Sequence, residues 1–269
     1  ASGASWAIRE NGANSAAAMT NVRNFMHVSY KNSVLRPKKA AEYTVGGRRF
    51  AIICHMNKRQ LTPVDRLLAS ANNALRTVAA PAGRSARANP AANIIDAELN
   101  ARQKRHAAGL MRINHAGEVA AQALYQGHAT VARDKQVEAQ LQHAADEEFD
   151  HLAWCEERIN ELGEDVSKLS PFWYAGAYAI GAASGILGDK WSLGFIAETE
   201  KQVCAHLDSH LESLPPEDVK SRAIVEQMRD EEEEHGENAK DAGAADLPAP
   251  VKRLMRLTAK VMTKTAYWV

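Results

Sequence analysis

The chain has 269 residues, of which 45% are hydrophobic and 6% aromatic, so it can enclose one large core or two small ones. Its 33 lysines and arginines balance 33 aspartates and glutamates, which argues against a nucleic-acid-binding protein. The three cysteines are odd in number and lack a Cys-x-x-Cys pair, which argues against a disulfide framework.

Residues 1–55 differ from the rest of the chain in composition. They carry eight basic residues against two acidic ones, are rich in alanine, serine and asparagine, and show no sustained periodicity. A transit-type leader has this composition. We favour the simpler interpretation, a disordered or non-native extension.

Residues 56–95 are predicted to form an amphipathic helix and a linker. Thr62 and Pro63 make a typical helix start, and apolar residues then recur at helical spacing up to Val78. Pro81, Gly83 and Pro90 indicate the linker.

Residues 96–246 are predicted to form four long helices, at roughly 102–132, 135–162, 172–213 and 218–242. Prolines are absent from 91–170, 172–214 and 217–247. Polar or helix-breaking residues separate the helices near residue 133, at Gly163 and at Pro215-Pro216. This organisation indicates an all-α fold.

Two Glu-x-x-His pairs stand out within these helices. Only two of the ten histidines follow a glutamate by three residues: His151 follows Glu148, and His235 follows Glu232. Residues three apart share a helix face, and both faces are otherwise largely apolar. A buried carboxylate must become protonated, find a partner or bind a cation, so each pair is a candidate metal-binding motif.

Two further glutamates complete the pattern. In antiparallel helices, residues placed symmetrically about the turn come together. Reflection through the break near residue 133 places Glu148 beside Glu118, and reflection through Pro215-Pro216 places Glu232 beside Glu200. Four glutamates and two histidines are the ligand set of di-iron and di-manganese carboxylate bundles.

The other acidic residues near these motifs are predicted to be exposed. Asp150 could orient a ligand histidine, but an exposed position is favoured. The run Asp230–Glu234 is interpreted as a solvated face on which only Glu232 is in phase with His235. Replacing Glu231 by alanine is therefore expected to be nearly silent.

The segment 171–188 has no charged residue and four glycines. Its length just reaches that of a membrane span, but the glycines and the following Asp189-Lys190 argue against a simple span. Aromatic residues there are typical of a bilayer interface. A bundle helix packed on small residues explains the segment equally well.

Residues 247–269 are predicted to form a basic amphipathic helix. Val251–Val269 contains five lysines and arginines, no acid, and an apolar stripe. Such a helix favours an anionic membrane surface, so we expect this helix and the one near 63–78 to face a membrane. Docking on the bundle or on a partner is the alternative.

Several motifs resemble the demethoxyubiquinone hydroxylase family of ubiquinone biosynthesis, its bacterial members more than its mitochondrial ones. The resemblance covers about residues 58–269. The stretches that carry it are Gly109–Glu118 (GLMRINHAGE), Glu147–Leu152 (EEFDHL), Glu198–His206, Met228–His235 and Ala259–Lys264 (AKVMTK).

The resemblance implies a ferritin-like four-helix bundle that holds two iron ions and uses O2 to hydroxylate the ring of a polyprenylated demethoxyquinol. The implied ligands are the six residues selected above by spacing: Glu118, Glu148, His151, Glu200, Glu232 and His235. It also implies that His206 lies near the iron site. Animal members have a tyrosine where this chain has Leu207, which puts a role for tyrosine there in doubt.

The implied partners are the quinol and a lipid bilayer surface; other ubiquinone-biosynthesis proteins and a second copy of the chain are candidates. The implied location is the cytoplasmic face of a bacterial inner membrane, with the matrix side of the mitochondrial inner membrane as the alternative. Two other functions fit parts of the pattern. A ferroxidase or iron-storage bundle explains the ligands, and a non-enzymatic membrane-associated scaffold would pair its carboxylates with lysine or arginine.

Overall fold

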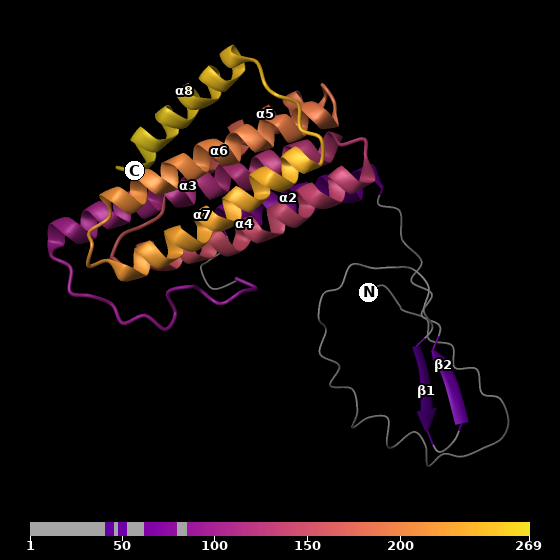
Figure 1. Cartoon of the computed structure of the whole chain (residues 1–269), viewed down its shortest axis with the longest axis horizontal. Helices are drawn as coiled ribbons and strands as arrows, with labels where there is room; N and C mark the ends of the chain where they lie inside the picture. The colour runs from indigo at the N-terminus through magenta and orange to yellow at the C-terminus, as the bar shows by residue number, and fades with distance from the viewer. Residues whose placement is uncertain (1–40, 46–47, 53–61, 80–84) are drawn as a thin grey trace. The chain divides into compact units, whose positions relative to one another are not determined.

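The computed structural model describes residues 41–45, 48–52, 62–79 and 85–269. The chain divides into two compact units, Ala1–Thr62 and Pro63–Val269. Figure 1 shows the helices of the second unit, which contains every predicted site residue.

The first unit contains a hairpin that was not predicted. Strands β1 (Ala41–Val45) and β2 (Arg48–Ile52) are antiparallel, with Ala41 opposite Ile52 and Val45 opposite Arg48. Aromatic and β-branched residues on both sides of a Gly-Gly pair are a hairpin signal that the compositional argument overlooked. Most of residues 1–55 lie outside the described part of the chain, so the prediction of a disordered or non-native extension stays a prediction there.

The second unit is helical, which confirms the predicted all-α, ferritin-like class. Its helices are α2 (Pro63–Ala79), α3 (Ala101–Val131), α4 (Lys135–Glu161), α5 (Ser170–Gly185), α6 (Asp189–Ser213), α7 (Val219–Asp241) and α8 (Ala249–Ala266). Helix α2 begins at Pro63, as the Thr62-Pro63 pair predicts.

Local signals in the sequence account for most helix ends. Asn100 and Gln103 form a capping box at the start of α3, and Asp134 caps α4. Asp218 caps α7 by accepting a hydrogen bond from the Ser221 amide. Beyond α4, Gly163 has φ 83°, a left-handed conformation that favours glycine.

The predicted helix 172–213 is wrong as a single element, because it is divided into α5 and α6. The chain between them turns at Gly188, whose φ of 117° is strained for any other residue. The next residue, Asp189, accepts hydrogen bonds from the amides of Arg133 (3.1 Å) and Asp134 (2.8 Å). The start of α6 is thereby joined to the turn between α3 and α4.

Helix α5 lies along α3, and their backbones meet at glycines. A β-carbon at Gly181 would lie 2.4 Å from the carbonyl oxygen of Leu124, and one at Gly127 would lie 2.4 Å from that of Tyr178. The side of α5 that contacts α3 is therefore packed on small residues, which is one of the two interpretations of segment 171–188. Among the described residues, no helix combines the length and the apolar character needed to cross a membrane.

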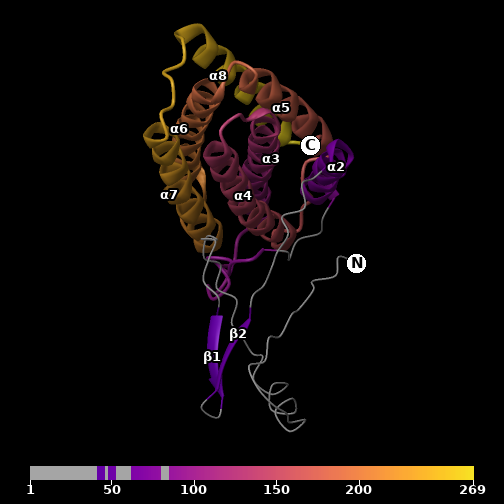
Figure 2. The same cartoon turned by 90° about the vertical axis from the view of Figure 1, so that its right-hand side faces the viewer.

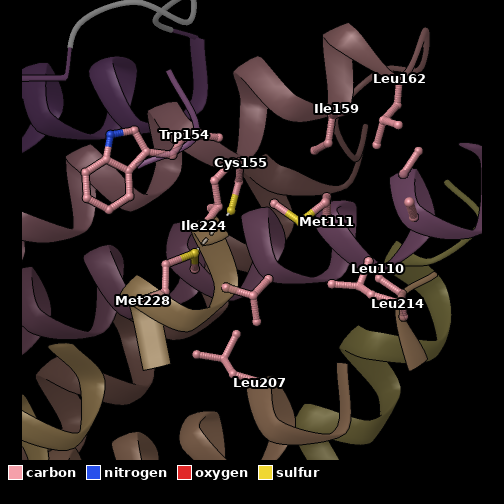
Figure 3. Packing of buried hydrophobic residues seen from close by; sticks show 14 of the residues in the cluster. Leu110, Met111, Trp154, Cys155, Ile159, Leu162, Leu207, Leu214, Ile224 and Met228 are labelled. Carbon is pink, nitrogen blue, oxygen red and sulfur yellow. Dashed lines mark hydrogen bonds between the residues drawn. The ribbon is translucent and has the colours of Figure 1, made fainter. Parts of the chain in front are cut away.

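The central helices α3, α4, α6 and α7 run alongside one another (Figures 1 and 2). Their buried side chains form two apolar layers. The first layer, shown in Figure 3, is lined mainly by Leu110, Met111, Trp154, Cys155, Ile159, Leu207, Ile224 and Met228. The second layer contains Ala121, Tyr125, Leu141, Ala145, Leu193, Ile196 and Ala239. On each of the four helices, the predicted metal ligands lie between the residues of these two layers.

Helices α2 and α8 leave apolar side chains exposed, although α8 is tied down at its end. Tyr267 packs against Gly109, and its hydroxyl lies 2.9 Å from Nδ1 of His106. The end of α8 is therefore docked on the bundle, whereas contact of α2 and α8 with a membrane stays a prediction. The apolar residues with more than half of their surface exposed are Val64, Leu68 and Leu75 on α2 and Leu254, Leu257 and Val261 on α8.

Candidate metal centre

Each central helix contributes to one buried polar cluster. Helix α3 provides Glu118 and α6 provides Glu200, whereas α4 and α7 each provide a Glu-x-x-His pair. All six side chains are buried. One ligand atom from each of Glu118, Glu148, His151 and Glu232 can be chosen so that these atoms all lie within 4.8 Å of one another.

The glutamates of the two Glu-x-x-His pairs lie between the two imidazoles. Glu148 oxygens are 3.3 Å from Nδ1 of His151 and 3.5 Å from Nδ1 of His235. Glu232 oxygens are 3.1 Å and 3.2 Å from the same two atoms. Both carboxylates are therefore shared by both histidines.

The other two glutamates lie at opposite ends of this arrangement. Glu118 approaches His151, with 3.9 Å between its carboxylate and Nδ1. Glu200 accepts a hydrogen bond of 2.7 Å from the hydroxyl of Tyr125, and the Tyr125 ring packs edge-on against His235. The cluster thus has one unshared carboxylate on each side of the shared pair.

Oxygen atoms in the cluster lack the hydrogen-bond donors that burial requires. Both oxygens of Glu148 and one oxygen each of Glu200 and Glu232 are buried without a donor. Within the described residues, no lysine or arginine forms an ion pair with Glu118 or with these three glutamates. Because unpaired buried carboxylates are costly, the donor set fits divalent cations.

The electrostatics of the cluster show the same shortage of positive charge. Burial raises the pKa of Glu118 and Glu200, and the neighbouring glutamates raise it further. Burial alone would lower the pKa of His151, but the carboxylates of Glu118 and Glu148 that face it outweigh burial and raise it. Two divalent ions would balance the four glutamates and release both imidazoles to act as neutral ligands.

The outer nitrogen of each histidine binds a carboxylate from the opposite helix. Nε2 of His151 on α4 lies 2.7 Å from Glu231 on α7, and Nε2 of His235 on α7 lies 2.9 Å from Glu147 on α4. An ionised carboxylate only accepts, so Nε2 carries the proton and Nδ1 is left to face the cluster.

The interpretation of Glu231 as a solvated acid is therefore wrong. Its side chain is only 16% exposed and contacts both His151 and Arg87, whereas its neighbours Asp230 and Glu233 are exposed. The expectation of a silent Glu231→Ala replacement loses its basis. The repeated Glu-Glu-x-x-His sequence at both motifs is the signal that could have identified the outer glutamates.

Asp150 was also predicted to be exposed, and that prediction is wrong. The residue is buried and accepts hydrogen bonds from Ser85 (2.9 Å), the Ala86 amide (2.7 Å) and Nε of Arg87 (2.5 Å). The partners lie in the segment interpreted as a linker, which has no periodicity to reveal such a role.

The contacts of His206 are with residues outside the cluster. Its ring packs on His210, with 4.0 Å between the centroids, and it borders a pocket lined by Ile113, Tyr267 and Trp268. In the part of the chain that the structure describes, no hydrogen bond or ion pair joins His206 to the six predicted ligands. A role near the site stays a prediction.

A bundle with a buried, shared carboxylate and histidine cluster belongs to the class of ferritin-like di-metal carboxylate proteins. Comparison with known families supports this class independently. The family model described as "Ubiquinone biosynthesis protein COQ7" matches residues 105–266, which include all six predicted ligands. The chain belongs to the COQ7 family of ubiquinone biosynthesis proteins.

Similar curated proteins carry one name, 3-demethoxyubiquinol 3-hydroxylase. The protein of Chromobacterium violaceum is 58% identical over 206 residues, which are 77% of this chain and 100% of that protein. The protein of Pseudomonas fluorescens is 56% identical over 210 residues, 78% of this chain and 98% of its own. The protein of Polynucleobacter necessarius is 53% identical over 208 residues, which are 77% of this chain and 99% of that protein.

Proposed function

We propose that this protein is a 3-demethoxyubiquinol 3-hydroxylase, a di-iron monooxygenase of ubiquinone biosynthesis. Its substrate would be a polyprenylated demethoxyquinol, 2-polyprenyl-3-methyl-6-methoxy-1,4-benzoquinol, and its co-substrate O2. The observation that carries the proposal is the buried six-residue cluster, which lies within the residues matched by the COQ7 family model. The shared name of relatives more than half identical to the chain supports the substrate.

Two iron ions would be held by Glu118, Glu148, His151, Glu200, Glu232 and His235. Carboxylate and imidazole together suit iron, and six protein ligands on two ions leave positions for O2 or substrate. Bound iron supplies the activation of O2 that side chains alone cannot perform. The reaction transfers one oxygen atom to the ring and forms water from the other, and it consumes two electrons from an external reductant together with two protons.

The protein's own contribution is to position the ligands and to exclude water. Glu147 and Glu231 fix the rotation and the tautomer of the two imidazoles. Tyr125 holds Glu200 through its hydroxyl. The first apolar layer excludes water from one side of the cluster, which strengthens the electrostatic interactions there. On the other side, Tyr125, Ile196 and His235 border a pocket that leads to the cluster.

The exposed apolar side chains support a location at a bilayer surface. In Figure 2, α2 and α5 lie on the side of the bundle away from α7, and α8 lies across the top of the view. Each of these three helices exposes large apolar residues, such as Leu68, Phe172 and Leu257. The basic residues of α8 suit anionic lipids. We place the protein peripherally on the cytoplasmic face of a bacterial inner membrane, in keeping with its bacterial relatives; the mitochondrial inner membrane is the alternative.

The test compares metal-free and iron-loaded protein on a short-tailed demethoxyquinol with O2 and a chemical reductant. Iron-loaded protein should form the hydroxylated quinol, and metal-free protein should not. A Glu148→Ala variant, folded by circular dichroism, should bind no iron and form no product. Oxidation of iron with the quinol unchanged would replace the proposal with a ferroxidase function. Full iron binding by the Glu148→Ala variant would contradict the ligand assignment.

A further inference from the structure

The segment Ser85–Arg87 joins the two helices that carry the Glu-x-x-His pairs. Nε of Arg87 donates to Asp150 on α4 at 2.5 Å, and its two terminal nitrogens donate to the two oxygens of Glu231 on α7 at 2.6 and 2.9 Å. A guanidinium that uses three donors in this way fixes the plane of the carboxylate it meets.

Other contacts hold the guanidinium in its place. Asp150 also binds the hydroxyl of Ser85 and the amide of Ala86, so the backbone beside Arg87 is anchored to α4. The guanidinium carbon lies 4.9 Å from the ring centre of Trp154, which is itself buried and packs on the ring of His151. A planar cation stacked on an aromatic ring has little freedom to rotate.

The position of Arg87 reaches the metal cluster through one intermediate residue. Glu231, fixed by Arg87, accepts a hydrogen bond of 2.7 Å from Nε2 of His151. His151 then presents Nδ1 to Glu148 and Glu232. An orientation set at Arg87 is therefore transmitted to one ligand nitrogen of the cluster.

The second histidine lacks a hydrogen-bonded arginine behind its outer carboxylate, although the charge of Arg87 also acts on Glu147. Nε2 of His235 binds Glu147, whose other ion-pair partner is His143, at 3.2 Å. His143 is 74% exposed, and Glu147 is 33% exposed. Among the described residues, no arginine or lysine forms an ion pair with Glu147. The two halves of the cluster have matching ligands but unequal outer support.

We infer that Arg87 is a positioning residue that makes the two metal positions unequal, holding the ion beside His151 more firmly than the ion beside His235. This inference rests on the metal site of the proposed function. The segment preceding the four-helix core therefore takes part in assembling the site, and is not only a connection to it.

The experiment adds a Mössbauer-active iron isotope as Fe²⁺, without oxygen, to the metal-free full chain and to Arg87→Gln. Iron retention against a competing chelator and the Mössbauer spectrum are measured, and circular dichroism and unfolding of the metal-free proteins show whether the fold survives. The matched control is Arg76→Gln. Arg76 also stacks on an aromatic ring of α4, that of Phe149, without contacting the cluster.

In Arg87→Gln, one of the two iron equivalents should be lost about 10-fold more readily, because outer partners of metal ligands typically contribute 10–100-fold in affinity. The spectral component of that ion should change while the other stays. Arg76→Gln should behave as the unsubstituted protein. If Arg87→Gln does not fold, Arg87→Lys, which keeps the charge but lacks the planar fork, should show the same selective loss to a smaller degree.

If Arg87→Gln retains both iron equivalents as firmly as the unsubstituted protein and its spectrum is unchanged, Arg87 contributes to the fold only and the inference is overturned. Equal weakening of both ions would also overturn it. If the unsubstituted chain binds no iron, the metal site itself fails and the inference fails with it, so the two failures are distinguishable.

Discussion

Replacing Gly181 by alanine should destabilise the bundle, although alanine is the better helix former. The added β-carbon would lie 2.4 Å from the carbonyl oxygen of Leu124 and 3.2 Å from its Cα. Both atoms belong to the backbone of α3, so no side chain can rotate away. The helices must separate by about 1 Å to reach ordinary van der Waals contact.

Overpacking of this kind costs about 1–3 kcal/mol in the free energy of unfolding. In a unit of this size each kcal/mol corresponds to roughly 2–4 °C, so the melting temperature should fall by roughly 2–12 °C. The matched control is Gly176→Ala on the same helix, where a β-carbon meets nothing within 4 Å. That variant should be more stable by about 0.5–1 kcal/mol, because glycine is the poorer helix former.

The assay is chemical denaturation of the metal-free proteins, followed by circular dichroism. A Gly181→Ala variant as stable as Gly176→Ala would show that α5 does not pack closely on α3, and would refute this account of the glycine-rich segment.

Three further predictions concern buried polar groups. The guanidinium of Arg158 lies 2.8 Å from the carboxylate of Asp218, which is fully buried. Arg158→Met leaves this carboxylate without its ion-pair partner and should lower the free energy of unfolding by about 3–5 kcal/mol. The double variant Asp218→Asn/Arg158→Met removes the unpaired charge, so an equal loss in that variant would contradict the prediction. Tyr125→Phe should destabilise the metal-free protein by about 1–3 kcal/mol in chemical denaturation, because Glu200 loses its donor, and added Fe²⁺ should reduce the difference. Burial lowers the pKa of His128 from its ordinary 6.5 to about 4, so this histidine contributes stability that is present above pH 6.5 and lost as the pH falls towards 4. In His128→Leu the loss of unfolding free energy between about pH 7 and about pH 5 should be smaller, and an unchanged loss would refute the assignment.

The helices and the candidate ligands could be predicted because their signals are local or symmetric. The Glu-x-x-His spacing places two side chains on one helix face, and reflection through a turn locates the opposing glutamate. The predicted boundaries of α3, α4 and α7 agree with the structure to within one residue. The reflection also reached Glu200, since α6 and α7 are antiparallel neighbours whatever precedes α6.

The remaining features depend on contacts that local patterns do not encode. Arg87 and Glu231 are separated by 144 residues, and nothing in the spacing of either indicates the other. Asp150 lies between the ligands Glu148 and His151 in the sequence but does not share their helix face. Hydrogen bonds from the segment Ser85–Arg87 hold it in its buried position. The break at Gly188 was overlooked because no proline marks it, and because a glycine in a segment that contains four of them does not reveal its φ angle.

The central claim is that the buried cluster makes this chain a monooxygenase, and the mass of the product after one turnover tests it most directly. Iron-loaded protein would be reduced, mixed with a short-tailed demethoxyquinol and exposed to isotopically labelled O2. The account predicts a quinol that is heavier by one labelled oxygen atom, with Glu148→Ala giving none. Unlabelled quinol from protein that retains and oxidises both irons would contradict the account, even with the bundle and its metal centre intact.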